Sequence, residues 1–262
     1  NSMSKVSNKK IDTITMGFDV YKDTHLDEVN LAKMISKNYK TNSTFSYQDK
    51  EAFFKMKDDI LNDMDQPSID GINTYMISNL AKKLGFKVAL SGIGGDELFS
   101  GYPTFKHVPK MKKIYDKTFF SERFSNLYKR CTLSFFNLLN LKKLSYFYEF
   151  SNSYIGAYTL RRSLFMPDEL HAFLPSKFIN DGLEEFNQKL IDENNLISID
   201  DDISKVIYLE FNNYLKNQLL KDADWAGMAN SVEIRVPFID KEFIDTCLHL
   251  NLKQNINKNF LI

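Results

Sequence analysis

Residues 89–102 read ALSGIGGDELFSGY, and this stretch decides how the chain is interpreted. It holds four of the ten glycines of the chain, followed by the adjacent carboxylates of Asp96 and Glu97. The residues just before the turn, FKVALS at 86–91, predict a short buried strand. In open parallel sheets, ligands bind at the carboxyl ends of the strands. The stretch therefore predicts a ligand site at such an edge.

The residue types in this turn point to a metal–nucleotide site. Glycines let the backbone approach a phosphate closely, and free N–H groups can then bind it. Asp96 and Glu97 cannot bind phosphate directly, but carboxylates can hold Mg²⁺, which bridges to phosphate oxygens. The alternative is an ordinary loop whose acidic residues favour a helix N-terminus. The turn matches neither a GxxxxGK[ST] phosphate loop nor a GxGxxG dinucleotide turn.

The segments before the turn alternate between strand and helix patterns. Residues 11–18 alternate apolar and polar side chains, which predicts a strand. Amphipathic spacing predicts helices over the ranges 26–40, 50–64 and 70–84, and Gly85 suits the end of the third helix. This order predicts an α/β fold with a parallel sheet.

The character of the chain changes after about residue 110. The range 111–160 is rich in Phe, Tyr, Leu and Lys, and the range 180–222 has helical periodicity with almost no glycine or proline. We predict an α/β nucleotide-binding part over 1–110 and a mainly helical part over 111–262. The aromatic residues of the second part are expected to pack between helices rather than to bind a cofactor.

Composition excludes some classes of function. The chain has 34 basic and 34 acidic residues among 262, so charge gives no reason to expect binding to nucleic acid or membranes. The longest apolar run near the middle, 131–141, is shorter than the roughly 20 residues that span a bilayer. Cys131 and Cys247 are predicted to be reduced, buried thiols of a cytoplasmic protein. Asn1 and Ser2 before Met3 look like vector-derived residues, so we expect the chain to be part of a longer protein.

Two long motifs resemble one known family. KVALSGIGGDELFSGY (87–102) resembles the second signature of the synthetase domain of glutamine-hydrolysing asparagine synthetases, SG-x-G-[GSA]-DE-x-F-x-GY. LLKDADWAGMANSVEIRVPFIDKEFID (219–245) resembles the D-x-x-SMA-x-S-x-E-x-RVPF-x-D segment of that family. Looser matches are ITMGFDV with the helix that follows it, and Gln66-Pro67. Together the matches span nearly the whole chain.

The resemblance implies a fold and an activity. The fold would be a Rossmann-like α/β domain of the ATP-pyrophosphatase (adenine nucleotide alpha hydrolase-like) type. The activity would be that of an ATP-dependent carbon–nitrogen ligase, which adenylates a carboxylate, usually that of aspartate, and releases pyrophosphate. Ammonia from a glutaminase domain would then displace AMP to form the amide. ATP and Mg²⁺ would be required, since Mg²⁺ neutralises charge on the departing pyrophosphate.

The resemblance also implies roles for individual residues. Ser91 and Gly92 would contact ATP, Asp96 would bind Mg²⁺, and Glu97 would support that site as a catalytic residue. Met16 matches a position whose backbone faces the adenine, although its side chain could equally belong to the core.

Lys258, in NKNFL (257–261), would steady the acyl-adenylate transition state, or it is simply a solvated lysine. Glu233 and Arg235 share a face of an extended stretch, where they could form a structural ion pair or contact the substrate.

The sequence departs from the family in three ways. No SGG-x-DS pyrophosphate loop is present, and no glutaminase half with its N-terminal Cys. The loop belongs to the strand before 11–18, so its loss should expose strand edges, through which the chain could form a homo-oligomer. The fragment alone is expected to bind ATP weakly and to be inactive. Ile93 occupies a position that is usually acidic or, in β-lactam-forming relatives, Tyr. The alternatives are therefore another acceptor, such as a sugar or peptide carboxylate, or a non-catalytic binding relative.

Overall fold

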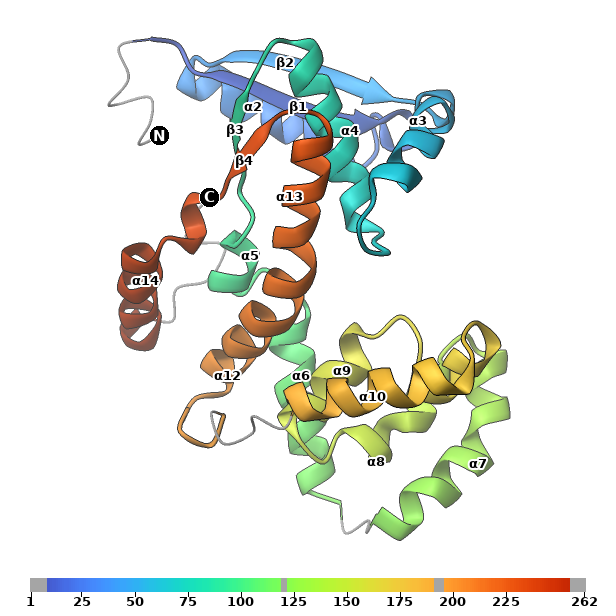
Figure 1. Cartoon of the computed structure of the whole chain (residues 1–262). Helices are drawn as coiled ribbons and strands as arrows, with labels where there is room; N and C mark the ends of the chain where they lie inside the picture. Colours follow the sequence, from blue (N-terminus) through green and yellow to red (C-terminus); the bar gives the residue numbers. More distant parts are fainter. Residues whose placement is uncertain (1–8, 119–121, 191–195, 255–262) are drawn as a thin grey trace. The chain divides into compact units, whose positions relative to one another are not determined.

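The structure is a computed structural model that describes residues 9–118, 122–190 and 196–254. It contains two compact units (Figure 1). The strand unit comprises Asn1–Gly92 and Lys216–Pro237, and the helical unit comprises Ile93–Leu215 and Phe238–Ile262.

The strand unit contains two separate pairs of parallel strands with helices packed beside them. β1 pairs with β2, from Asp12 beside Asn42 to Phe18 beside Gln48, and β3 pairs with β4. Helix α13 packs along α4 (Figure 1). The elements of this unit are β1 (Asp12–Phe18), the 3₁₀ turn η1 (Asp19–Tyr21), α2 (Glu28–Tyr39), β2 (Asn42–Gln48), α3 (Lys50–Asp63), α4 (Asp70–Lys83), β3 (Val88–Leu90), α13 (Leu220–Ala229) and β4 (Glu233–Arg235).

Local signals explain the helices of the strand unit. The side chain of Asp27 accepts a hydrogen bond from the backbone N–H of Val29, which caps the start of α2. Asp49 caps α3 in the same way through the N–H of Ala52. Gly85 follows α4 with a φ of 84°, a left-handed conformation that suits glycine. The three helices predicted before residue 85 are confirmed.

Strand β2 was not predicted from the sequence. Its residues, NSTFSYQ, are mostly polar and lack a clear apolar alternation. The strand is held by its parallel ladder to β1 and by a hydroxyl–hydroxyl hydrogen bond of 2.6 Å between Thr13 and Ser43. Pairing with a partner distant in sequence can outweigh weak local preference.

The prediction of a strand within 86–91 is confirmed, but the prediction that this strand is buried is wrong. β3 has three residues, and the side chains of Val88 and Leu90 are 42% and 52% exposed. Among the described residues β3 pairs only with β4, so nothing continues the sheet on its other edge. A parallel sheet is normally covered on both faces, which is why the apolar run suggested burial.

The core of the strand unit lies between α3, α4 and α13. Trp225 is buried beside Tyr75, with ring centroids 6.0 Å apart. Gly71 lies so close that a Cβ there would be 2.5 Å from Cζ2 of Trp225. Gly227 similarly leaves room for the carbonyl of Val232, 2.7 Å from where a Cβ would stand. These contacts give a packing role to Trp225 and Gly227.

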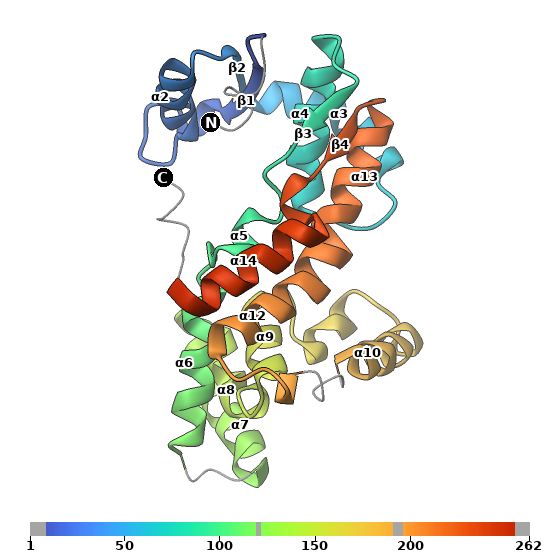
Figure 2. The same ribbon diagram turned by 90° about the vertical axis from the view of Figure 1, so that its left-hand side faces the viewer.

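The helical unit confirms the prediction of a mainly helical second part. Its core includes Val108 of α6, Ala157 and Tyr158 of α9, and Val206 of α12. Helices α6, α9 and α12 pack against one another (Figure 2). The expected core packing of the aromatic residues holds only in part: Tyr146 and Tyr158 are buried, whereas the side chains of Phe124, Phe135, Phe165, Phe173 and Phe178 are exposed. Its elements are α5 (Gly95–Leu98), α6 (Thr104–Asp116), α7 (Glu122–Leu138), η2 (Lys142–Tyr146), α8 (Phe147–Phe150), α9 (Tyr154–Arg162), η3 (Pro167–Ala172), α10 (Ser176–Leu190), α12 (Asp202–Leu209) and α14 (Lys241–Gln254).

Two short elements span the borders between the units. The π-helical segment η4 (Glu210–Leu219) and the 3₁₀ turn η5 (Pro237–Ile239) each contribute residues to both. The units differ from the predicted division at residue 110, because Lys216–Pro237 joins the strand unit through the α13–α4 packing and the β3–β4 ladder. Periodicity along the chain does not reveal that a late segment packs with the N-terminal segments.

The two cysteines differ in burial. Cys247 is buried in a cluster with Leu98 and Phe99, and burial raises the pKa of its thiol. Cys131 is exposed, so the prediction of two buried thiols is wrong for this residue. It lies on α7, which leaves several apolar side chains, such as Leu138, in solvent. Within the described ranges, no helix combines the length and apolar character needed to cross a membrane.

Candidate functional site

The two family-like motifs lie beside each other although they are far apart in sequence. In the strand unit, Leu90 pairs with Arg235, and the N–H of Ser91 donates a 2.8 Å hydrogen bond to the carbonyl of Arg235. The ladder thus joins the strand before the glycine turn to the EIR of the second motif.

Contacts in the helical unit join the rest of the same two motifs. Gly94 has a φ of 93°, and a Cβ there would lie 2.9 Å from Cγ2 of Ile239 and 3.2 Å from Cβ of Phe238. Gly95 also faces Phe238, whose ring atoms lie 3.5 Å from the position of a Cβ. These two glycines are therefore required by a tight turn and close packing.

Gly92 is the glycine of the turn whose surroundings fit a ligand. A Cβ at Gly92 would have no described atom within 4 Å, and the residue is exposed. Gly101, in contrast, leaves room for the carboxylate of Asp96. Of the four glycines in the turn, Gly92 alone keeps the predicted role of opening the backbone to a nucleotide. Gly94, Gly95 and Gly101 are explained by contacts within the protein.

Asp96 occupies the first turn of α5, where an acidic side chain is favoured. The short helix ends at Leu98, and Ser100 beyond it has a φ of 57°. The N–H of Gly101 donates a 2.8 Å hydrogen bond to the carbonyl of Asp96. This hydrogen bond places Gly101 directly against the Asp96 carboxylate. Asp96 is half-buried.

Glu97 has a different environment from its neighbour. Its side chain is 1% exposed, and Oε1 accepts a 2.9 Å hydrogen bond from the hydroxyl of Tyr102. Burial raises the pKa of the Glu97 carboxyl, and the nearby charges of Asp96 and Glu210 act in the same direction. Burial and the Glu97 charge also raise the pKa of Tyr102.

Glu210 is a second buried carboxylate in the helical unit, and it is fully hydrogen-bonded. Arg162 donates from Nε to Oε1 at 3.2 Å and from Nη2 to Oε2 at 2.8 Å. The hydroxyls of Thr104 and Tyr158 also donate to this carboxylate. Glu210 is 0% exposed, so these donors replace its lost hydration.

The guanidinium of Arg162 links the two buried carboxylates. Its central carbon lies 4.4 Å from the ring centroid of Tyr102 and 3.9 Å from that of Tyr214. The two tyrosine rings meet edge to face, with centroids 5.9 Å apart. We call the set of Glu97, Tyr102, Arg162 and Glu210 the carboxylate network.

Sequence reasoning missed Tyr102, Arg162 and Glu210 as partners of the predicted site. Tyr102 is in the quoted motif, and its position could have signalled a role. Arg162 and Glu210 are 48 residues apart, and neither belongs to a recognisable pattern.

Met16 belongs to β1 in the strand unit. It is partly buried and packs against the cluster that contains Ile60 and Trp225. The side chain therefore contributes to the core, which was one of the two alternatives. The proposed contact of its backbone with adenine stays a prediction.

Glu233 and Arg235 form an ion pair across one face of β4. Nε of Arg235 lies 2.8 Å from Oε1 of Glu233, and both side chains are more than half exposed. The hydrogen bond and charge of Arg235 lower the pKa of Glu233, and Glu233 raises that of Arg235. The ion pair of the structural alternative is present, and contact of these two residues with a substrate stays a prediction.

Lys258 lies outside the described residues. Within the described ranges, no cluster of three or more His, Cys, Asp or Glu side chains could hold a metal by itself. Mg²⁺ is usually held by one or two carboxylates together with water and phosphate oxygens, and Asp96 fits that mode. Glu97 is turned into the carboxylate network instead.

The strand unit also contains a buried carboxylate that was not predicted. Asp222 is 1% exposed and accepts hydrogen bonds from Ser68 at 2.6 Å and from the indole of Trp225 at 3.0 Å. Ser68 in turn accepts from the N–H of Gly71 at the start of α4. Gln66, of the QP pair, donates to the carbonyl of Asn217 at 3.1 Å. The QP segment thus anchors the start of α4.

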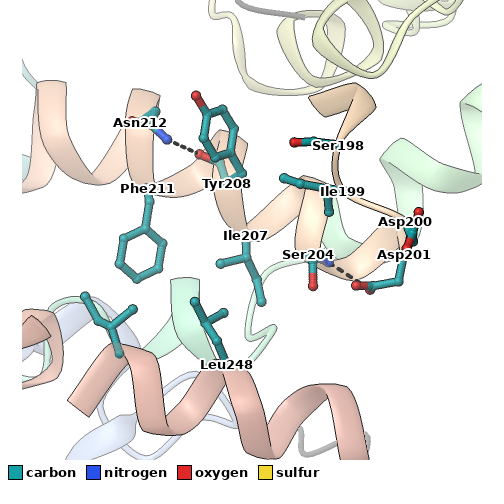
Figure 3. Close-up of a pocket in the computed structure, with 11 residues that line it drawn as sticks. Ser198, Ile199, Asp200, Asp201, Ser204, Ile207, Tyr208, Phe211, Asn212 and Leu248 are labelled. Atoms are coloured by element: carbon teal, nitrogen blue, oxygen red, sulfur yellow. Dashed lines mark hydrogen bonds between the residues drawn. The ribbon is translucent and has the colours of Figure 1, made fainter. Parts of the chain in front are cut away.

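A cavity of about 560 Å³ lies elsewhere in the helical unit (Figure 3). Ile207, Phe211 and Leu248 form its apolar wall, and Asp201 at its rim caps α12. No predicted site residue lines it.

We expect Glu97→Gln to raise the melting temperature of the metal-free protein at about pH 7.5. A carboxyl whose pKa is raised on folding contributes stability that is full below the unfolded pKa and is lost as pH rises through the folded pKa. Gln keeps an oxygen that can accept from Tyr102 but carries no charge.

Calorimetry of both proteins from about pH 4.5 to 8 would measure this effect, and the gain should shrink at the acidic end. Glu184→Gln, at an exposed position, is the matched control and should change little. An unchanged or lower melting temperature for Glu97→Gln at neutral pH would contradict the expectation.

Comparison with known proteins supports the resemblance that the two motifs suggest. A family model described as asparagine synthase matches residues 1–260. The chain is 25% identical to asparagine synthetase [glutamine-hydrolyzing] 1 of Bacillus subtilis (strain 168) over 248 residues, which cover 93% of this chain and 37% of that protein. It is 41% identical to asparagine synthetase B [glutamine-hydrolyzing] of Escherichia coli (strain K12) over 44 residues, 17% of this chain and 8% of that protein.

The chain therefore spans little more than a third of the first relative, at 37% of its length. No solved structure matches the chain. The family model nevertheless extends over almost every residue. The chain belongs to the asparagine synthase family.

Proposed function

We propose that the chain acts as the synthetase domain of an ATP-dependent carbon–nitrogen ligase that converts aspartate to asparagine. The carboxylate attacks the α-phosphorus of ATP, so that a carbonyl–O–P linkage forms and pyrophosphate leaves. Ammonia then displaces AMP. The observation that supports this proposal best is that the glycine turn and the RVPF segment are in contact, with Gly92 open.

The residues of the turn have separate tasks in this proposal. The backbone at Ser91 and Gly92 binds phosphate oxygens, since Gly92 leaves its amide approachable. Asp96 would hold Mg²⁺, which supplies positive charge to the pyrophosphate as it leaves. Glu97 supports Asp96 from its buried position. Met16 contributes its backbone to adenine binding.

Residues outside the turn complete the proposal. Arg235 and Glu233 are exposed at the two ends of β4, where they can contact the substrate carboxylate and amino group. Lys258 would stabilise negative charge on the adenylated intermediate as a compact ammonium.

The nitrogen donor is proposed from the relatives. Both are named glutamine-hydrolyzing asparagine synthetases. Ammonia would therefore come from a glutaminase domain, in a protein that works in the cytoplasm. Formation of homo-oligomers stays a prediction.

Ile93 supports a second candidate function. Its apolar side chain can neither move a proton nor pair with a charge. An acceptor other than aspartate, such as a sugar or peptide carboxylate, would fit a site that lacks the usual acidic residue.

We expect Asp96→Asn to lower the rate of AMP formation by about 100-fold, because the variant loses the charge that holds Mg²⁺. AMP and pyrophosphate would be measured with the full-length product of the gene, Mg-ATP, glutamine and aspartate. Asp58→Asn, on an exposed side chain of α3, is the control and should keep the normal rate. Equal rates for Asp96→Asn and the unmodified protein would contradict the assignment.

A further inference from the structure

The carboxylate network connects the glycine turn to helices distant in sequence. Glu97 lies on α5, Arg162 ends α9, and Glu210 opens η4. All belong to the helical unit. Two buried carboxylates in one network are costly unless each is paired, so the network needs a specific reason to exist.

Tyr102 is the direct partner of Glu97. Its hydroxyl donates to Oε1 of Glu97, which lies five residues earlier in the chain. The left-handed conformation of Ser100 turns the backbone between these two residues. Gly101, between the two, makes room for Asp96. The Gly101–Tyr102 pair therefore shapes the surroundings of both acidic residues.

Arg162 in turn holds the ring of Tyr102. The guanidinium lies against the Tyr102 ring at 4.4 Å and against the Tyr214 ring at 3.9 Å. Its own orientation is set by the two-point contact with Glu210. A planar guanidinium fixed by such a contact is a rigid support for an aromatic ring.

We infer that Tyr102 and Arg162 are positioning residues: Arg162, oriented by Glu210, holds the Tyr102 ring, and Tyr102 holds the Glu97 carboxylate beside Asp96. This inference rests on the proposed function, because it assigns the network to the reaction site. It adds Arg162, which lies outside both motifs, and gives a role to Tyr102, the last residue of the first motif.

A positioning role and a purely structural role predict different effects on kcat. A misplaced support shifts the reacting groups without removing a ligand contact. Tyr102→Phe, which keeps the ring and loses the hydroxyl, should therefore lower kcat by about 10- to 100-fold with a much smaller change in KM for Mg-ATP.

The kinetic experiment uses the full-length gene product with Mg-ATP, glutamine and aspartate. The variants are Tyr102→Phe, Arg162→Lys and the double variant. Lys keeps a positive charge near Glu210 but loses the planar stack, so Arg162→Lys should fold and still lower kcat. Because both changes act on one support, the double variant should lose little more than Tyr102→Phe alone. Tyr128→Phe on α7 is the control and should keep normal kinetics.

A thermal cycle on the same chain tests the network without any reaction. Arg162→Lys and Glu97→Gln should be non-additive in melting temperature by about 2 °C in the presence of Tyr102. The non-additivity should vanish when Tyr102 is Phe. Simple attraction between the charges of Arg162 and Glu97 would persist in that background.

The outcomes separate the two proposals. Normal kcat for Tyr102→Phe, multiplied effects in the double variant, or coupling that survives Tyr102→Phe would each overturn the inference. If the unmodified protein forms no AMP, the proposed function fails. The thermal cycle then still tests whether Arg162 and Glu97 are coupled through Tyr102.

Discussion

Replacing Arg162 by Met is expected to lower the free energy of unfolding by about 3–5 kcal/mol, because it leaves a buried carboxylate without its ionic partner. Glu210 is 0% exposed, and two of its hydrogen bonds come from Arg162. The remaining donors, Thr104 and Tyr158, are neutral. Urea unfolding followed by circular dichroism would measure the loss.

Two further variants give this experiment its controls. Arg161→Met changes the same residue type one position earlier, where the side chain is exposed, and should cost little. Arg162→Met combined with Glu210→Met removes both charges and should recover most of the loss. A single Arg162→Met variant as stable as the unmodified protein would contradict the buried ion pair.

Replacing Trp225 by Ala is expected to lower the free energy of unfolding by about 3–5 kcal/mol, the usual range for removing a buried Trp. The side chain is 6% exposed, packs beside Tyr75 and donates to Asp222. Trp225→Phe keeps an aromatic ring but loses the donor to Asp222, so it should cost about 1–3 kcal/mol. This loss is smaller than that of Trp225→Ala because the Phe ring keeps part of the packing.

The chain has one tryptophan, so circular dichroism rather than Trp fluorescence has to follow the variants of Trp225. Phe54→Ala, on α3, is the control, because its side chain is 55% exposed. A loss no greater for Trp225→Ala than for Phe54→Ala would contradict the central place of Trp225 in the strand unit.

Much of the fold could be predicted because its signals are local. The strand at 11–18, the helices before residue 85 and the stop at Gly85 each depend on neighbours in sequence. β2 was missed because its polar residues are ordered by a partner strand. The burial of β3 was predicted wrongly because its apolar run does not show how many neighbours the strand has.

The candidate site was predicted only in part for the same reason. The motif located Asp96 and Glu97, and the pairing of Glu233 with Arg235 followed from their alternation. The motif did not show that Gly94 packs on Ile239, or that the Glu97 side chain points inward to Tyr102. Such contacts join segments distant in sequence, and a single sequence carries no pattern for them.

The most direct test of the proposed reaction uses aspartate labelled with ¹⁸O in its side-chain carboxyl. The full-length gene product would be given this aspartate with Mg-ATP and glutamine, and the nucleotide products would be analysed by mass spectrometry. We expect one labelled oxygen in AMP and unlabelled pyrophosphate, because the carboxylate attacks the α-phosphorus and its oxygen leaves with AMP. AMP without label, or label in inorganic phosphate together with ADP, would contradict the acyl-adenylate route.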